Sequence, residues 1–238
     1  VASHDLQEPL RKIQAFGDRL RACCGELMGE KGLDYLERMQ NAANRMQTLI
    51  RDLLTLSRVT SNAHPFVEID LAEVVRGVLS DLEVRIEQTA AQIEVGFLPK
   101  IEADALQMRQ LFQNLIANAL KFRKPDEPPN IVIAAKMLQV QEPQFIGANI
   151  EDEVCRIVVQ DNGIGFDQKY SDRVFALFQR LHSREEYEGT GIGLAVCRKI
   201  LDRHSGSIMA KSVAGEGSTF IVTLPVKQTM KGPEEYAR

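Results

Sequence analysis

Three glycines stand directly before an apolar, helix-patterned segment in the stretch "RLHSREEYEGTGIGLAVCRKI". They are Gly189, Gly191 and Gly193, and the segment Leu194–Ile200 follows them. The start of a helix carries free N–H groups and a partial positive charge, so it binds anions. Glycine also lets the backbone come close to a phosphate. The pattern therefore indicates a phosphate site, with a flexible loop and a helix cap as the alternative.

A second glycine-containing stretch, "DNGIGF", follows an apolar segment that is typical of a strand. Its Asp161 carboxylate can accept a hydrogen bond from an exocyclic amine such as that of adenine. The alternative is an ordinary turn, which the order Asp-Asn-Gly also favours.

A third stretch, "QNLIANALKF", places Asn114 and Asn118 four residues apart on one helical face, with Lys121 three residues further on. Amide oxygens suit Mg²⁺ when phosphates supply the negative charge. Two asparagines inside an apolar helix need hydrogen-bond partners. These residues are therefore candidates for a Mg²⁺ and phosphate site, or else polar groups that pair within the core.

The chain begins with "VASHDLQEPLRKI", in which His4 and Asp5 are adjacent near the head of a helical pattern. A neutral imidazole is a nucleophile, and a neighbouring carboxylate can accept the N–H of its other ring nitrogen. The alternative is an ordinary surface histidine near a chain end. The remaining histidines, which are His64, His182 and His204, are interpreted as ordinary.

The composition bounds the class of protein. The 238 residues are 44% hydrophobic and 26% charged, with a net charge of −4, as expected of one large or two small globular domains. An acidic balance argues against a nucleic-acid surface, and no apolar run approaches the ~20 residues of a membrane helix. Four cysteines without a CxxC pair indicate free thiols in a reducing compartment. Because the sequence opens without Met, we expect a piece of a longer chain.

Two helical patterns must position His4. Apolar residues recur at threes and fours over residues 6–27 and again over residues 33–56, and the segment "CGELMGEKG" between them breaks the pattern with Gly25, Gly29 and Gly32. Two such helices form a hairpin, but one hairpin cannot bury both apolar stripes. We therefore predict a dimeric four-helix bundle.

The rest of the chain mixes strands and helices. Residues 58–70 form a linker leading into a first strand. Helices are predicted over 71–91, 105–122 and 194–204, strands over 92–99, 131–140 and 154–163, and a closing hairpin over 205–225. A polar loop with Pro143 and Gly147 joins the middle strands. This α+β order predicts helices packed on one face of a sheet, an α/β sandwich. The predicted domains are 1–64, 65–228 and a flexible tail, 229–238.

Taken together, six ordered stretches resemble the motifs of a sensor histidine kinase. They are an H-box ("SHDLQEPL"), an N-box ("NLIANALKF"), a G1 box ("DNGIGF"), an F-box ("VFALFQRL"), a G2 box ("GTGIGLA") and a G3-like "GEGSTF". The sequences of the first and fifth stretches are similar to those of phytochrome-type bacterial kinases. The resemblance spans nearly the whole chain. It implies a dimerisation and phosphotransfer hairpin followed by an ATP-binding domain of the Bergerat fold.

The resemblance also implies roles for particular residues. His4 would accept the phosphoryl group, with Asp5 polarising it. Asn118 would bind Mg²⁺, and a further set of residues would bind ATP. By the same resemblance, Asp161 would read the adenine amine, Arg180 would contact the γ-phosphate, and Phe175 and Phe178 would anchor a lid. The ATP-binding set is Asn114, Lys121, Asp161, Gly163, Gly165, Phe178, Arg180, Gly189, Thr190, Gly191, Gly193, Leu194 and Thr219.

By the same resemblance, the partners would be a second copy of the chain, the receiver domain of a response regulator and an upstream sensor domain in the same chain. No nucleic acid or membrane is expected to contact this segment, and the location would be cytoplasmic. One position departs from the family pattern, since many relatives that also act as phosphatases carry Thr or Asn where this chain has Glu8. Phosphatase activity therefore stays open.

Two other functions are compatible with parts of the pattern. One is an ATP hydrolase or ATP-driven clamp of the wider Bergerat group. Those hydrolases place a carboxylate one helical turn before the Mg²⁺-binding asparagine. Here Asn114 stands in that place, and an amide is a poor base. The other is a dimerisation module that only senses nucleotide, against which intact His4 and Asn118 argue.

Overall fold

The computed structural model describes residues 2–61, 64–139, 153–181, 186–187 and 189–228, with the side chains of residues 2–6 and of Thr60 left out. The chain divides into two compact units, Val1–Arg58 and Val59–Arg238. Each is considered by itself. The predicted polar loop with Pro143 and Gly147 and the predicted tail 229–238 lie outside the described residues.

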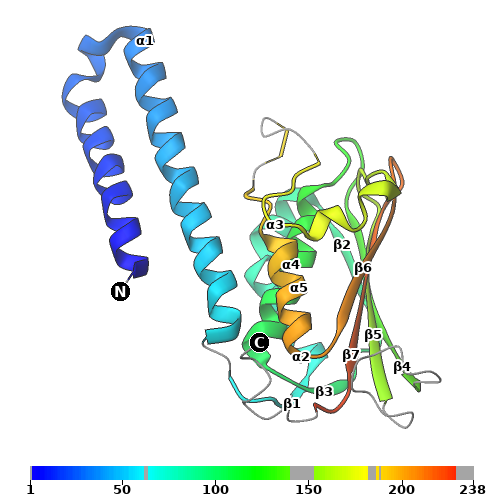
Figure 1. Cartoon of the computed structure of the whole chain (residues 1–238). Helices are drawn as coiled ribbons and strands as arrows, with labels where there is room; N and C mark the ends of the chain where they lie inside the picture. The colour runs from blue at the N-terminus through cyan, green and yellow to red at the C-terminus, as the bar shows by residue number, and fades with distance from the viewer. Residues whose placement is uncertain (1, 62–63, 140–152, 182–185, 188, 229–238) are drawn as a thin grey trace. The chain divides into compact units, whose positions relative to one another are not determined.

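The first unit is a helical hairpin. It consists of α1 (Ala2–Ser61), which leaves helical geometry at Gly29 (φ 61°, ψ 173°), and its two arms run side by side (Figure 1). The Gln40 side chain donates to Asp18 Oδ1 at 2.7 Å across the arms. A positive φ is a conformation that glycine adopts without steric cost. The broad break predicted from Gly25, Gly29 and Gly32 is thus confined to Gly29, and the other two glycines stay helical.

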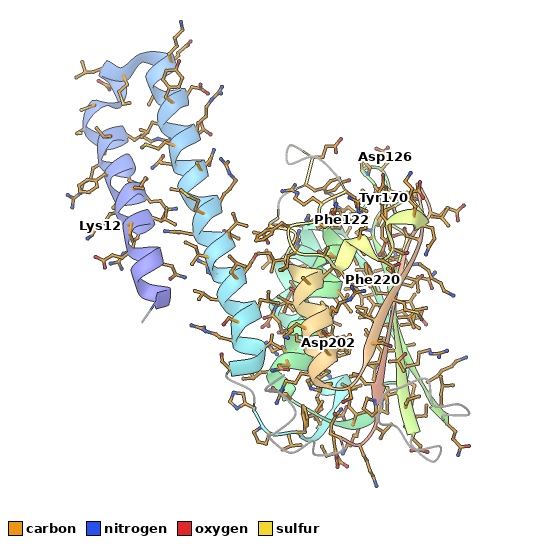
Figure 2. The ribbon with its side chains drawn as sticks, viewed as in Figure 1. Lys12, Phe122, Asp126, Tyr170, Asp202 and Phe220 are labelled. Carbon is orange, nitrogen blue, oxygen red and sulfur yellow. The ribbon has the colours of Figure 1, made fainter. Side chains whose placement is uncertain are left out.

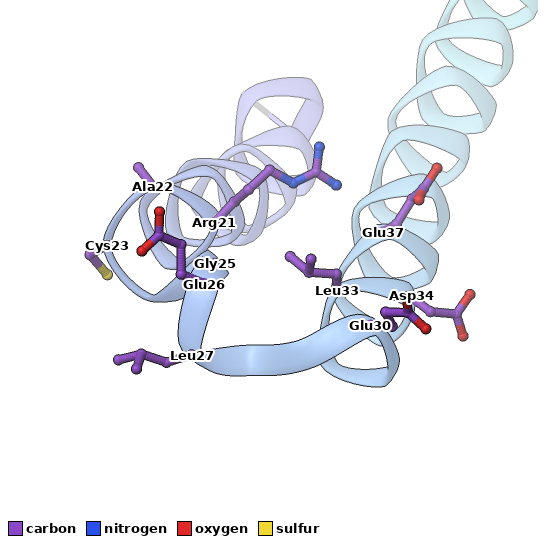
Figure 3. Close-up of a pocket in the computed structure, with 10 residues that line it drawn as sticks. All are labelled: Arg21, Ala22, Cys23, Gly25, Glu26, Leu27, Glu30, Leu33, Asp34 and Glu37. Carbon is purple, nitrogen blue, oxygen red and sulfur yellow. The ribbon is translucent and has the colours of Figure 1, made fainter.

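The hairpin buries few of its own apolar side chains. Leu10, Leu36 and Ala43 are buried, but many large apolar residues remain exposed. On the first arm these are Ile13, Phe16, Leu20 and Leu27, and on the second they are Tyr35, Met39, Met46 and Leu53. At the bend, Leu33 points toward the first arm, whereas Cys23 and Leu27 project away from the hairpin (Figure 3). The exposed apolar stripes indicate that a partner buries them, because contiguous apolar surface of this kind marks an interaction site.

The second unit is built on a five-stranded sheet with the strand order β2-β4-β5-β7-β6. These strands are β2 (Gln92–Val95), β4 (Asn130–Gln139), β5 (Glu153–Asp161), β6 (Ser207–Val213) and β7 (Gly217–Pro225). All neighbours are antiparallel except the parallel pair β2 and β4. A separate two-stranded sheet pairs β1 (Val67–Asp70) with β3 (Lys100–Ala103).

The helices of this unit lie on one face of the large sheet, as predicted (Figure 1). They are α2 (Leu71–Asp81), α3 (Glu83–Thr89), α4 (Ala105–Lys121) and α5 (Gly193–Arg203), with short 3-10 turns at Gln168–Tyr170 and Arg173–Phe175. Alternate residues of β6 are buried, which is the pattern of a sheet with one covered face. Phe112, Ile157 and Ile200 are among the fully buried side chains between these layers. Each such side chain contributes about 1.5–3 kcal/mol by leaving water.

Several details differ from the sequence prediction. The strand predicted over 92–99 ends at Val95, and α1 continues to Ser61, into the segment 58–70 that was predicted as a linker. The single helix predicted over 71–91 is broken at Leu82 (φ −98°, ψ 5°), so that α2 and α3 are separate. The strand β3 was missed, because it has only four residues and its alternation is hard to distinguish from a loop. Within the described part of the chain, no helix is both long and apolar enough to cross a bilayer.

Candidate functional site

Asp161 ends β5 and is held by the backbone around it. Its Oδ1 accepts hydrogen bonds from the N–H groups of Gly163 at 2.8 Å and Ser218 at 3.2 Å, while the residue is only 9% exposed. Burial raises the pKa of the Asp161 carboxyl to about 6, although the two N–H groups pull it down. Both of these bonds fall on Oδ1 and neither on Oδ2. The carboxyl therefore keeps an oxygen that can recognise a donor on a ligand.

The turn after Asp161 is packed against the end of α4. The Ile164 N–H donates to the carbonyl of Phe122 at 2.9 Å, and a Cβ on Gly163 would stand 2.4 Å from that oxygen. No other residue than glycine fits this approach. Gly165 follows in the same turn, and Thr219 on β7 lies opposite Gln160 on β5. The structure thus brings four predicted residues, Asp161, Gly163, Gly165 and Thr219, to one end of the sheet.

Two residues that support this turn were not predicted. Ser218 supplies one of the N–H groups to Asp161, and Asn162 accepts from the Asn130 N–H at 2.7 Å and donates to the Pro128 carbonyl at 3.2 Å. Asn162 therefore ties the turn to the start of β4. The available signals were weak, namely the position of Ser218 within "GEGSTF" and the middle place of Asn162 in "DNG".

The polar face of α4 carries Asn114, Asn118 and Lys121, all half-buried. The Asn114 Nδ2 donates to the Gly193 carbonyl at 3.2 Å, and its Oδ1 accepts from Gln110 Nε2 at 3.2 Å. The interpretation of Asn114 as a polar group paired inside the fold thus holds in this structure. Gln110 was not predicted, although it lies one turn before Asn114. The amide joins α4 to the first residue of α5.

The predicted glycine loop lies over the end of α4. Arg180 donates from its two terminal nitrogens to the carbonyls of Gly189 and Tyr187, each at 2.6 Å. The Lys121 Nζ lies only 2.9 Å from where a Cβ on Gly189 would stand. Tyr187, which was not predicted, packs against Phe122 with 5.1 Å between ring centroids. Two cationic side chains therefore converge on the backbone of this loop.

The last part of the loop leads into α5 without a side-chain cap. Gly191 has φ 76°, and a Cβ on it would stand 2.7 Å from the carbonyl oxygen of Gln179. Thr190 is half-buried, Ile192 is fully buried, and α5 begins at Gly193 with Leu194 in its first turn. Because no side chain caps the N-terminus of α5, its first N–H groups are available to an anion.

The two phenylalanines expected to anchor the loop behave differently. Phe175 is 3% exposed and meets Phe220 edge-on, with 6.4 Å between ring centroids; Figure 2 labels Phe220. Phe178 is 54% exposed and has φ 61°. Of these two, Phe175 is the one packed into the interior here.

His4 and Asp5 lie in the first turns of α1, in the other unit, and their side chains are outside the described part. One turn later, Glu8 pairs with Lys12, with 2.8 Å between Oε1 and Nζ (Figure 2 labels Lys12). Pro9 is inside α1 and does not end it. Among the described residues, no three His, Cys, Asp or Glu side chains come together as a metal centre.

The second unit therefore combines a buried carboxyl, an uncapped helix start and two cations beside a glycine loop. Two family models match the chain. Residues 103–228 match the family described as "Histidine kinase-, DNA gyrase B-, and HSP90-like ATPase", and residues 1–62 match the "His Kinase A (phospho-acceptor) domain".

Similar proteins are longer than this chain. Phytochrome-like protein Cph1 of Synechocystis sp. is 42% identical over 226 residues, which are 95% of this chain and 28% of that protein. Sensor histidine kinase WalK of Bacillus subtilis is 31% identical over 235 residues, 95% of this chain and 36% of that protein. The chain thus spans about a third or less of the relatives it matches.

Two solved structures share the fold. Full-length ShkA in complex with AMPPNP covers 97% of this chain and 46% of its own, with a TM-score of 0.67 and 20% identity. The catalytic domain of histidine kinase ThkA covers 69% of this chain and 97% of its own, with a TM-score of 0.54 and 25% identity.

Proposed function

This chain belongs to the sensor histidine kinase family, and from that premise we propose that it transfers the γ-phosphoryl group of ATP to His4 and then to an aspartate of a response regulator. The observation that carries the proposal is the Asp161 turn beside the glycine loop in one unit, with His4 heading the helix of the other. The test is incubation of the wild-type chain and a His4→Ala variant with γ-labelled ATP.

The Asp161 turn fits adenine. Its Oδ1 accepts hydrogen bonds from two backbone N–H groups, so Oδ2 accepts a hydrogen bond from the exocyclic amine of the base. The glycine cradle supports this, because a Cβ at Gly163 would fill the space against Phe122. Thr219, on the neighbouring strand, and Gly165, in the same turn, complete the pocket.

The phosphates fit the other end of the site. The uncapped start of α5 offers N–H groups, Lys121 lies beside Gly189, and Arg180 is positioned by the same loop. We propose that Arg180 turns from the loop carbonyls to the γ-phosphate when ATP binds. Gly191 and Thr190 then close over the triphosphate, with Phe175 as the fixed point of the loop.

Mg²⁺ would be held by Asn118, because an amide oxygen is a ligand for it and ATP supplies the charge. Once bound, the ion would neutralise charge on the phosphates. Asn114 is engaged with Gly193 and so orients the start of α5.

The transfer needs positioning and charge neutralisation more than covalent help from the ATP domain. A neutral His4 nitrogen attacks the γ-phosphorus, the bond to the bridging oxygen breaks, and ADP leaves. Asp5 accepts the N–H of the other ring nitrogen and so keeps the attacking nitrogen unprotonated. Lys121 and Arg180 balance the charge of the phosphates. Because Asn114 offers an amide where a hydrolase carries its base, direct attack by water is disfavoured.

The proposal includes a second copy of the chain, an upstream sensor domain and a cytoplasmic location. The four cysteines, all free, fit a reducing compartment. A homodimer would cover the exposed stripes of the hairpin, in which Ile13, Leu20 and Leu27 recur every seven residues, as do Met39, Met46 and Leu53. Spacing of seven is that of a helix–helix seam.

We predict that Phe16→Glu combined with Leu20→Glu makes the chain monomeric. Both side chains are exposed, at 59% and 44%, so the change costs a lone hairpin little and places charge in the dimer seam. Sedimentation velocity measures the result. Val84→Glu is the matched control, since Val84 is 66% exposed on α3 of the other unit and should leave the dimer intact. A double variant that remains dimeric would place the dimer elsewhere.

We also predict that binding of the adenine base weakens as the pH falls through about 6. Asp161 has a raised pKa of about 6, so its acceptor form is lost there instead of near 4. The proton goes to Oδ2, since Oδ1 already accepts two N–H groups. At pH 5, affinity should be roughly tenfold below that at pH 8, because only the ionised fraction binds.

Adenosine is the proper ligand for this titration, since a terminal phosphate itself titrates at about 6. Calorimetry from pH 5 to pH 8 measures the affinity. A flat profile would show that Asp161 does not bind the base as a carboxylate.

A further inference from the structure

The segment that leaves α1 is bonded to four residues of the second unit, here called the linker seat: Asp104, Gln107, Arg203 and His204. Gln107 Nε2 donates to the Val59 carbonyl at 2.8 Å, and the His64 N–H donates to Asp104 Oδ2 at 2.9 Å. Arg203 donates to the His64 carbonyl at 2.5 Å. Both backbone groups of His64 are therefore bound, and Val59 is 5% exposed.

Asp104 is the centre of the seat and is fully buried. Its Oδ1 caps α4 by accepting from the N–H groups of Leu106 and Gln107, at 3.1 and 3.2 Å. Its Oδ2 accepts from Arg203 at 2.9 Å as well as from His64. A buried carboxylate needs such a full set of partners, so removing Arg203 leaves it undercompensated.

Aromatic contacts close the seat. The Arg203 guanidinium lies over the Phe66 ring, 4.5 Å from its centroid, and the same ring lies 4.8 Å from that of His204. His204 is fully buried, and burial lowers its pKa to about 4, so the ring is neutral. Its Nδ1 donates to the Ile200 carbonyl at 2.7 Å and its Nε2 accepts from the Asp104 N–H at 3.1 Å. Both ring nitrogens of His204 are therefore hydrogen-bonded within the unit.

The seat lies at the far ends of the two helices that carry the phosphate site. Asp104 caps the N-terminus of α4, and Asn118 follows fourteen residues later, about 21 Å away at the rise of a helix. α5 starts at Gly193 and ends at Arg203, about 15 Å away. The linker is therefore attached to α4 and α5, which also carry the proposed phosphate site. The attachment lies at the opposite ends of these helices from the nucleotide.

From this arrangement we propose that Arg203 and Asp104 are positioning residues for the transfer to His4. They hold Val59, His64 and Phe66 against the ATP-binding unit, so that the last turn of α1 moves with that unit and the hinge lies before Val59. The compact unit that contains the seat begins at Val59, so the last turn of α1 belongs to that unit. The proposal rests on the proposed function, since it concerns how ATP reaches His4.

The test is Arg203→Met in the full chain, which keeps the side-chain stem over Phe66 and removes the donors to Asp104 and His64. At saturating ATP, the rate of His4 labelling should fall about tenfold, because a looser tether spends less time in the reactive geometry. The affinity for ATP should stay within about twofold, since the seat does not touch nucleotide. Arg203→Lys, which keeps the charge, should fall between wild type and Arg203→Met.

Hydrogen exchange gives a readout that does not depend on catalysis. The amides of residues 59–61 and of His64 should exchange faster in Arg203→Met, and those of β5 should not change. Arg109→Met is the matched control, since Arg109 also pairs with an aspartate across two elements, Asp81 of α2, but lies away from the linker. It should alter neither rate nor exchange.

The outcomes separate this proposal from the proposed function. Unchanged exchange at residues 59–64 overturns the clamp whether or not the chain is a kinase. A parallel loss of ATP affinity and labelling rate also overturns it, since Arg203 would then only support the nucleotide pocket. If wild type labels no histidine while exchange responds as expected, the proposed function fails and the role in transfer fails with it.

Discussion

Replacing His4 with alanine abolishes labelling of the chain by γ-labelled ATP and leaves its affinity for ATP unchanged. This is the expected result because His4 and the nucleotide site belong to different units, Val1–Arg58 and Val59–Arg238. Mutations without shared contacts act independently, so a change in the first unit leaves the binding energy of the second untouched. The labelled fraction is measured on filters at neutral pH, and the affinity by displacement of a fluorescent nucleotide.

His64→Ala is the matched control for this experiment. His64 is an exposed histidine, and it bonds to Asp104 and Arg203 through its backbone N–H and carbonyl, which alanine keeps. It should be labelled as well as wild type. Persistent labelling of His4→Ala would assign the phosphoryl group to another residue.

Asp161→Asn should lower the affinity for ATP by about a hundredfold, about 2.7 kcal/mol, while the fold is kept. The amide oxygen still accepts from Gly163 and Ser218, but the other position becomes a donor that faces the amine of adenine. A buried hydrogen bond to a charged group is lost and two donors are left opposed. Calorimetry with ATP measures the effect.

Thermal stability distinguishes loss of the contact with adenine from partial unfolding as the cause of weak ATP binding in Asp161→Asn. Because burial disfavours the Asp161 carboxylate, a neutral amide there should not lower the thermal midpoint at pH 8. Asp167→Asn is the control, since Asp167 follows the same turn but pairs with Lys169 at an exposed position. Unchanged ATP affinity in Asp161→Asn would remove Asp161 from the base pocket.

The helices and the long strands were predictable because their apolar periodicity is strong. α4 repeats apolar residues on one face, and β4 and β5 are largely apolar runs of nine or ten residues. The break at Leu82 was not predictable, because the apolar pattern continues through it and Leu82 is not a helix-breaking residue. Short strands such as β3 have the same difficulty.

Some residues of the second unit were likewise predictable from local sequence patterns, and others were not. The turns at Asp161 and Gly191 were predictable, because glycine motifs mark turns and close backbone approaches. His204 was interpreted as an ordinary histidine, but it is a fully buried part of the linker seat. Its partner Asp104 is a hundred residues away, and a contact of that separation leaves no local pattern. The same holds for Gln107 and Arg203, whose roles depend on where the linker returns.

The central claim is that the phosphoryl group of ATP is transferred to His4. The most direct measurement is to incubate the wild-type chain with ATP and Mg²⁺, digest it at neutral pH and locate the phosphate by mass spectrometry. We expect one added phosphoryl group on the peptide that contains His4, with ADP as the other product. This phosphoryl group should be stable in alkali and lost in acid. Release of ADP and inorganic phosphate without a phosphorylated peptide, or a phosphate on any other residue, would contradict it.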